Sequence, residues 1–332
     1  MKVIVYSSKP YDQDFLIRSN QSYQHELLFV QQGLNLETVH LAQGYSAVCA
    51  FVNDQLDRQV LTQLAQYQVR LVALRCAGFD NVDLEAAKVL GIQVIRVGAY
   101  SPNAVAEHAL SLILTLNRKT HLAYQRIQQQ RNFSIDGLLG FDLAGKTLGV
   151  IGTGKIGAIL AKTTLAMGME VLAYDPLKNP ACEQLGVNYV DLHTLLSQAD
   201  VISLHCPLNE HTHHLIDAQA LLIMKPSVML INTSRGAVID TCAVLEALEQ
   251  KRIAYLGMDV YENEQGMFFE DLSCTHTADE LLEKLLALDN VLVTSHQGFF
   301  TQEALSNISD TTLKNIQRFE AGERIPDAEF LA

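Results

Sequence analysis

Short apolar runs rich in β-branched residues alternate with helical patterns along nearly the whole chain, and this alternation limits the folds that are possible. Continuous apolar strands separated by helices are typical of parallel sheets covered by helices on both faces. The first set of predicted strands comprises residues 2–6, 37–41, 47–51, 71–76 and 93–97. The second set comprises residues 147–151, 170–174, 201–204, 228–231, 255–258 and 291–294. The sequence therefore predicts two doubly wound α/β units, one after the other.

A chain of 332 residues has the length expected of two domains. We place the boundary near residue 100, where Tyr100-Ser101-Pro102-Asn103 combines a turn with a helix N-cap signal, and residues 104–130 then form one long predicted helix. No strand follows the predicted amphipathic helix 301–319, so we expect this helix to return to the first unit. The predicted domains are residues 1–100 with 299–332, and residues 101–298. Both are expected to be Rossmann- or flavodoxin-like, with a cleft between them.

The composition excludes several classes of protein. Hydrophobic residues make up 48% of the chain and charged residues 18%, which excludes a disordered chain. The formal charge of −13 argues against nucleic-acid partners and against docking on anionic membranes. The apolar run at residues 3–6 is too short for a signal peptide, and the apolar stretch 109–116 is too short for a membrane span. The six cysteines form no CxxC pair, so we expect reduced thiols and a cytoplasmic protein.

A glycine-rich turn follows the first strand of the second unit. Its sequence is Gly152-Thr153-Gly154-Lys155-Ile156-Gly157, it precedes a predicted helix at 158–167, and Asp175 ends the next strand. Such glycines allow a tight turn, close approach of a pyrophosphate and close helix–strand packing, and the acid accepts hydrogen bonds from a ribose. This pattern predicts dinucleotide binding, and Asp175 favours NAD because it would repel a 2′-phosphate. A purely structural glycine turn, with Asp175 as a turn residue before Pro176, is the alternative.

Later strands of the second unit end in polar residues, at 205–207, 232–236, 259–264 and 295–297. Ligands of an open parallel sheet bind outside the carboxyl ends of its strands, so we expect these groups to meet beside the nicotinamide end of the cofactor. Arg235 has the donor fork that suits a carboxylate, His296 is an acid/base candidate, and Glu264 is a carboxylate that stabilises its protonated form. Taken alone, Arg235 is equally compatible with a solvated Arg and Glu264 with a solvated acid, and a lone His is more often structural.

Three further features are weaker. His205, His211, His213 and His214 do not predict a metal site, because their loop lacks a settled ligand spacing and acidic partners. Cys206 before Pro207 is interpreted as a packing residue rather than a nucleophile. In the first unit, small residues after the strand at 71–76 (Arg75-Cys76-Ala77-Gly78-Phe79) are able to present backbone N–H groups to an anion.

These motifs together resemble the D-2-hydroxyacid dehydrogenase family, and most closely its NAD-dependent bacterial D-lactate dehydrogenases. The matching segments are RCAGFDNVDL at 75, SPNAVAEHAL at 101, GKTLGVIGTGKIG at 145, SLHCPL at 203, INTSRGAVID at 231, GMDVYENE at 257 and SHQGFFTQEA at 295. The FFED run at 268–271 resembles the lactate subgroup in particular. Gly98 and Gly298 depart from the family pattern, where Pro and Ala are usual.

The resemblance implies a fold, a reaction and a set of site residues. It implies a discontinuous substrate domain (1–100 with 299–332), an NAD-binding domain (101–298), and reduction of pyruvate to D-lactate by NADH in at least a dimer. His296 would be the proton donor, Glu264 its partner, and Arg235 the group that holds the substrate, which would also face Ala77, Gly78 and Tyr100. The implied cofactor contacts are Gly152, Gly154, Lys155, Ile156, Gly157, Asp175, Cys206, Pro207, Thr212, Thr233, Ser234, Arg235 and Asp259. A dehydrogenase for a larger 2-hydroxy acid, or an NAD(H)-sensing regulatory module on the same fold, is the alternative function.

Overall fold

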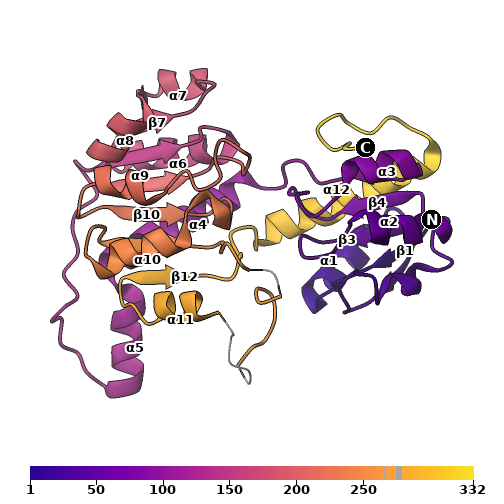
Figure 1. Cartoon of the computed structure of the whole chain (residues 1–332), viewed down its shortest axis with the longest axis horizontal. Helices are drawn as coiled ribbons and strands as arrows, with labels where there is room; N and C mark the ends of the chain where they lie inside the picture. The colour runs from indigo at the N-terminus through magenta and orange to yellow at the C-terminus, as the bar shows by residue number, and fades with distance from the viewer. Residues whose placement is uncertain (265, 274–278) are drawn as a thin grey trace. The chain divides into compact units, whose positions relative to one another are not determined.

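The structure is a computed structural model, and it describes residues 1–264, 266–273 and 279–332. The chain divides into two compact units, Met1–Ser101 with Phe300–Ala332 (unit 1) and Pro102–Phe299 (unit 2). Each unit contains one parallel β-sheet with helices on both faces (Figure 1). The predicted class of fold, two parallel-sheet α/β domains, is confirmed.

Unit 1 is built on a five-stranded sheet. Its strands, in spatial order, are β2 (Glu26–Phe29), β1 (Lys2–Val5), β3 (Ala47–Ala50), β4 (Leu71–Leu74) and β5 (Gln93–Ile95). On one face the core includes side chains from α1 (Pro10–Asn20) and α12 (Gln302–Ala321), and on the other it includes side chains from α2 (Arg58–Gln66) and α3 (Leu84–Leu90). The two central strands β3 and β4 are buried along their whole length, as their continuous apolar sequences require.

The C-terminal helix α12 belongs to unit 1. It begins after the N-cap Thr301, whose hydroxyl accepts from the N–H of Ala304, and it packs against α1. Leu313 and Ile316 of α12 are buried in the core against β1, β3 and β4. Beyond the helix the chain hydrogen-bonds to β5 and forms an isolated antiparallel bridge with it, but it adds no further strand and so no βαβ unit. Figure 1 shows α12, in yellow, alongside the N-terminal elements.

The strand predicted at residues 37–41 is wrong. The second strand of unit 1 is instead Glu26–Phe29 at the sheet edge, and Val39–Ala42 is a 3₁₀ helix. The Asn35 side chain accepts from the N–H groups of Glu37 and Thr38, and the Thr38 hydroxyl donates to the Gly33 carbonyl. Local side-chain bonds of this kind offer the backbone an alternative to a sheet ladder, which is why a β-branched segment here turns.

Unit 2 is built on a seven-stranded parallel sheet. Its strands, in spatial order, are β12 (Val291–Val293), β11 (Tyr255–Met258), β10 (Met229–Asn232), β9 (Val201–Leu204), β6 (Thr147–Ile151), β7 (Glu170–Tyr174) and β8 (Asn188–Tyr189). The core on one face includes side chains from α4 (Pro102–Arg118), α6 (Lys155–Ala166) and α7 (Pro180–Gln184). The core on the other includes α8 (Leu192–Gln198), α9 (Ala218–Ile223), α10 (Thr241–Glu249) and α11 (Glu280–Leu286). The short strand β8 was not predicted.

The order of these strands reverses between β6 and β9. From β6 the chain first builds outward through β7 and β8, and then returns to add β9, β10, β11 and β12 on the opposite side. Such a reversal leaves a crevice at the carboxyl ends of the two strands, because their connections leave in opposite directions. The glycine-rich turn after β6 and residues 205–207 after β9 therefore lie next to each other.

The long helix predicted at residues 104–130 is interrupted. It consists of α4 and α5 (Thr120–Gln130), separated by Lys119 in a left-handed conformation with φ of 49°. The buried side-chain amide of Asn117 donates to the Phe141 carbonyl and accepts from the Phe141 N–H. The Lys119 ammonium donates to the Leu139 carbonyl. None of the α5 residues is buried, so this helix leaves the core that α4 packs against. Within the described ranges, no helix combines the length and apolar character needed to cross a bilayer.

We predict that acid weakens the fold through His205 at the end of β9. Burial lowers the pKa of this imidazole from its ordinary value near 6.5 to about 4, and its Nε2 lies 2.9 Å from the Ser203 hydroxyl. Between these values the unfolded chain binds a proton that the folded chain does not, so the stabilisation is present above pH 6.5 and lost toward pH 4. From pH 7 to pH 5 His205 costs about 2 kcal/mol of unfolding free energy. Urea titrations at both pH values should show a smaller loss in His205→Gln, and equal losses would contradict the prediction.

Candidate active site

The glycine-rich turn after β6 is shaped by backbone packing. A Cβ on Gly157 would lie 2.0 Å from the Gly152 carbonyl oxygen, and a Cβ on Gly152, which has φ of 94°, would lie 2.7 Å from the Cys206 N. Neither position tolerates a side chain. A Cβ on Gly154, in contrast, would meet no atom within 4 Å. The turn therefore presents an open backbone face at its middle glycine, where a ligand is able to approach closely.

Several polar groups around this turn are suited to an anionic ligand. Helix α6 begins at Lys155 with Gly154 as N-cap, so no side chain caps its first N–H groups, which also have no partner within the helix. At the end of β10, two strands away, the buried Thr233 hydroxyl has no hydrogen-bond partner among the described residues. A buried hydroxyl left without a partner is costly, and a polar ligand at this edge would satisfy it.

Asp175, at the end of β7, is bound to the turn. One carboxylate oxygen accepts from the N–H and the hydroxyl of Thr153, at 2.6 Å and 3.1 Å, and the other accepts from the Leu177 N–H. The Tyr189 hydroxyl on β8 donates to the Thr153 hydroxyl at 2.8 Å, so β7 and β8 both hold the turn. Asp175 is partly exposed, and its carboxylate has lone pairs left for a ribose.

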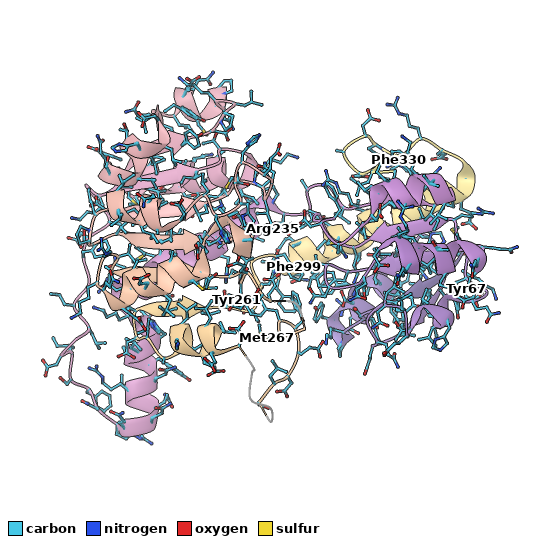
Figure 2. The ribbon with its side chains drawn as sticks, in the orientation of Figure 1. Tyr67, Arg235, Tyr261, Met267, Phe299 and Phe330 are labelled. Carbon is cyan, nitrogen blue, oxygen red and sulfur yellow. The ribbon has the colours of Figure 1, made fainter. Side chains whose placement is uncertain are left out.

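Arg235 lies in a tight turn after β10. The buried Asn232 side chain accepts from the Ser234 N–H and donates to the Arg235 carbonyl, which fixes the turn at both ends. A Cβ on the next residue, Gly236, would lie 2.1 Å from the Tyr261 carbonyl carbon, so only glycine lets the two segments approach so closely. The Arg235 turn is therefore packed directly against the chain that follows β11. Figure 2 shows Arg235, Tyr261, Met267 and Phe299 on the same side of unit 2.

The side chains of His296 and Glu264 are in hydrogen-bond contact. The distance from His296 Nδ1 to Glu264 Oε1 is 2.8 Å, and each side chain is 20% exposed. The second Glu264 oxygen accepts from the Tyr261 N–H at 3.0 Å, which holds the carboxylate in place. Because Nδ1 faces Glu264, the opposite nitrogen Nε2 is left available to exchange a proton with a ligand.

Asp259, the first residue after β11, holds the backbone on both sides of His296. Its buried carboxylate accepts from the N–H groups of Gln297 and Gly298 at 2.9 Å and 2.7 Å, and its own carbonyl accepts from the His296 N–H at 2.7 Å. The Thr294 hydroxyl donates to the same carboxylate at 2.5 Å, and His108 Nε2 on α4 lies 3.1 Å from it. Burial alone raises the pKa of Asp259, but the hydrogen bond and attraction of His108, with the other bonds, outweigh it and lower the pKa.

Three predicted cofactor residues lie on the loop after β9, beside the glycine-rich turn. Burial raises the pKa of the Cys206 thiol to about 11, so Cys206 is not a thiolate at neutral pH and is a poor nucleophile. The Thr212 hydroxyl donates to the Pro207 carbonyl and accepts from the Asn209 N–H, which closes the loop on itself. This hydroxyl therefore already has partners within its own loop.

The predicted substrate residues Ala77, Gly78 and Tyr100 belong to unit 1. The Arg96 guanidinium donates to the Ala77 carbonyl at 3.0 Å and lies 4.9 Å from the centre of the Phe79 ring. The N–H groups of Ala77 and Gly78 have no hydrogen-bond acceptor among the described residues. Their binding of an anion stays a prediction.

Sequence reasoning did not assign three residues that the structure places around His296. Phe269, in the FFED run, has its ring centre 5.9 Å from that of His296. His108 and Thr294 contact Asp259, but no local pattern marks either residue. Their contacts join α4 to the end of β12, which a spacing rule does not reveal. Of the cysteines, Cys49, Cys76, Cys182, Cys206 and Cys242 form no disulfide, and Cys274 lies outside the described residues.

Comparison with known proteins identifies the family. The model of the D-isomer-specific 2-hydroxyacid dehydrogenase NAD-binding domain matches residues 110–298. The D-lactate dehydrogenase of Escherichia coli is 52% identical over 98% of this chain and 99% of its own, and a 2-hydroxyacid dehydrogenase homolog of Haemophilus influenzae is 51% identical over 97% of each. The chain belongs to the D-isomer-specific 2-hydroxyacid dehydrogenases.

Solved structures agree with this membership. The structure of apo D-lactate dehydrogenase from Escherichia coli matches with a TM-score of 0.92, 50% identity and complete coverage of both chains. D-lactate dehydrogenase from Lactobacillus jensenii with NAD⁺ matches with a TM-score of 0.83 and 33% identity, over 100% of this chain and 99% of that one. This protein is accordingly an NAD-dependent dehydrogenase, and the predicted cofactor is confirmed. The open glycine turn, the uncapped α6 N-terminus and the Thr233 hydroxyl fit NAD.

We predict that Asp259→Asn impairs both stability and turnover. An amide offers one oxygen where the carboxylate offers two, and its NH₂ would face a backbone N–H of Gln297 or Gly298. The unpaired donors should lower the unfolding free energy by about 2 kcal/mol and displace His296, so kcat should fall about 100-fold. Urea unfolding and steady-state kinetics measure both effects.

Asp217→Asn is the matched control for this change of charge. Asp217 is the exposed N-cap of α9, where it accepts from the Ala220 N–H, and Asn caps a helix equally well. This variant should retain wild-type stability and kcat. Wild-type kcat in Asp259→Asn would show that the carboxylate does not position His296.

Proposed function

We propose that this protein is a D-lactate dehydrogenase that reduces pyruvate with NADH. The single observation that carries the proposal is the His296–Glu264 pair on the chain held by Asp259. The support for lactate comes from the relatives, since D-lactate dehydrogenase of Escherichia coli is similar over nearly the entire length. These features together favour a working enzyme over an NAD(H) sensor, which would not need the pair.

Each proposed catalytic residue has one task in this reaction. Arg235 binds the pyruvate carboxylate through its two-pronged guanidinium and orients the keto group. The hydride for the carbonyl carbon would come from bound NADH. His296 donates the proton from Nε2 to the developing alkoxide, and Glu264 stabilises the imidazolium from the Nδ1 side. The reverse reaction uses the same groups, with His296 as the base that accepts the hydroxyl proton of D-lactate.

We propose that NAD lies along the carboxyl edge of the unit 2 sheet. The α6 N-terminus would hold the pyrophosphate and Asp175 the adenosine ribose, while Thr233 and Asp259 would lie toward the nicotinamide end. The full proposed set of contacts is Gly152, Gly154, Lys155, Ile156, Gly157, Asp175, Cys206, Pro207, Thr212, Thr233, Ser234, Arg235 and Asp259. From unit 1, we propose that Ala77, Gly78 and Tyr100 contact the substrate, the first two through backbone N–H groups.

The test of the proposed function is loss of NADH absorbance with pyruvate, phenylpyruvate, glyoxylate and hydroxypyruvate in parallel. Pyruvate should give the highest kcat/KM. Glu264→Gln should lower kcat about 100-fold, because the amide cannot compensate the charge of the imidazolium. NADH affinity, measured by fluorescence, should stay near the wild-type value.

The exposed Glu249→Gln, at the end of α10, is the control and should be indistinguishable from the wild type. A higher kcat/KM with phenylpyruvate than with pyruvate would replace lactate by a larger 2-hydroxy acid. Absence of NADH oxidation with all four acids would contradict the dehydrogenase assignment to this chain.

We infer that the protein forms a homodimer through α5 and the chain that follows it. Phe133, Ile135 and Leu139 are 73%, 81% and 86% exposed, and Tyr124 on α5 is 66% exposed. Figure 1 shows α5 extending away from the sheet of unit 2. A concentration of exposed apolar side chains of this kind is typical of a protein–protein interface. We further propose that the dimer works in the cytoplasm, where its thiols stay reduced.

The dimer is tested by replacing both Phe133 and Ile135 with Asp. Two buried charges without partners should break the interface, so light scattering after gel filtration should give the monomer mass, half that of the wild type. Leu177→Asp changes an equally exposed leucine, 84% exposed, elsewhere on unit 2 and should leave the mass unchanged. A dimer mass for the double variant would place the interface elsewhere.

A further inference from the structure

A cluster of two histidines and one carboxylate lies outside the proposed active-site set. His214 belongs to the loop after β9 and Glu262 to the segment after β11, and His214 Nε2 lies 2.7 Å from Glu262 Oε1. The second Glu262 oxygen accepts from the Thr241 hydroxyl at the start of α10, at 3.0 Å. The position of Glu262 is thus fixed by two elements, and the proposed reaction gives neither His214 nor Glu262 a role.

His213 joins this pair because of the backbone at His214. Side chains of consecutive residues normally point apart, but His214 has φ of 50°, in the left-handed region. The two imidazoles are stacked, with ring centres 4.0 Å apart and planes 26° from parallel. One ligand atom from each of His213, His214 and Glu262 lies within 4.8 Å of the others. Two ring nitrogens and one carboxylate oxygen therefore lie close to one another.

The sequence pointed away from this arrangement. The histidine loop was expected to lack acidic partners for a metal site, and the one acid within it, Glu210, pairs with His211 instead. The structure supplies Glu262, which is 48 residues from His214 along the chain. Parallel strands bring the two together, since the segments after β9 and β11 leave the same edge of the sheet.

We propose that His213, His214 and Glu262 bind one divalent transition-metal ion of the zinc type. Imidazole nitrogens with one carboxylate suit Zn²⁺ and its neighbours, whereas Mg²⁺ and Ca²⁺ require oxygen ligands. Tetrahedral Zn²⁺ places its ligand atoms about 3.3 Å apart, given bond lengths of about 2.0–2.1 Å. To reach that spacing the stacked imidazoles must rotate apart so that one nitrogen of each points at the ion. Exposure permits this rotation: His213 is exposed, and the His214 and Glu262 side chains are 32% and 26% exposed.

Three protein ligands leave a fourth position for water, so the site binds the metal reversibly and from solvent. The net charge of −13 raises the local concentration of cations near the protein. Binding draws the histidine loop and the segment 261–264 together. Gly236, in the loop after β10, packs against the backbone of Tyr261 and Glu262. The ion would therefore stabilise contacts among the loops that follow β9, β10 and β11.

The experiment uses the full-length chain without a histidine tag, stripped of metal by a chelator. Calorimetric titration with Zn²⁺ should give one site per chain, and Co²⁺ should produce visible d–d bands of a tetrahedral complex. Bound Zn²⁺ should also raise Tm by about 2 °C or more at saturation. His213→Ala should weaken Zn²⁺ binding about ten-fold or more and abolish the Co²⁺ bands. Among the described residues His213 makes no side-chain hydrogen bond, so the variant should fold normally.

His211→Ala is the matched control, because His211 lies on the same loop, is 85% exposed at its side chain and has Glu210 as its side-chain partner within the described part of the chain. It should bind Zn²⁺ as the wild type does. Cys242→Ser removes an exposed thiol on α10 and should also retain binding. The proposal is overturned if His213→Ala binds Zn²⁺ with wild-type affinity, if His211→Ala loses as much, or if the wild type shows no saturable site. These outcomes are independent of NADH oxidation.

Discussion

The buried carboxylate of Asp259 is the interaction on which the candidate active site depends. It accepts hydrogen bonds from Thr294, Gln297 and Gly298, and the carbonyl of the same residue accepts from the His296 N–H. His296 has φ of 53°, a conformation that a non-glycine residue adopts at a cost. The converging bonds to Asp259 provide the free energy that maintains it. An unpartnered charge at this depth would destabilise the fold, so the same bonds make the burial of Asp259 possible.

Close backbone contacts connect this region to the rest of the site. Gly236 allows the Arg235 turn to touch the chain after β11, and Gly152 allows the glycine-rich turn to touch the chain after β9. In both cases the backbones of two loops at the carboxyl edge of the sheet are in direct contact. A shift of one loop would therefore shift the other. The substrate, cofactor and acid/base groups proposed within unit 2 are held in register by this packing, although they are distributed over about 145 residues of sequence (152–296).

Much of this arrangement could be predicted from sequence because it depends on local rules. Parallel strands buried on both faces have continuous apolar runs, and the turns that follow them carry the ligand-binding groups. The pairing of Glu264 with His296 could therefore be anticipated from the ends of two strands. The same rules fail where local hydrogen bonds compete with strand formation, as at 37–41, where the Asn35 side chain accepts from the Thr38 N–H. They also fail for the edge strand Glu26–Phe29, which has no continuous buried run.

Other features depend on distant residues and carry no local signal. The helix is interrupted at Lys119, next to Asn117, whose side chain hydrogen-bonds to the backbone of Phe141. That contact requires the chain to return after 24 residues. His108 reaches Asp259 across 151 residues, through the packing of α4 near the end of β12. Glu262 reaches His214 in the same way, from another connection of the sheet. Pattern reasoning identifies which strand ends meet, but side-chain partners between a helix and a loop are determined only by the packed structure.

Asp259 and Glu264 both lie near His296, but their different surroundings give the two carboxylates different roles. Asp259 is 2% exposed, and its two oxygens accept from backbone, hydroxyl and imidazole donors that hold it in place. Glu264 is 20% exposed, with one oxygen bound by the Tyr261 N–H and the other facing His296. In the proposed reaction the imidazole gains and loses a proton in every cycle. Only Glu264 faces the ring, so Asp259 fixes the position of His296 while Glu264 compensates its charge.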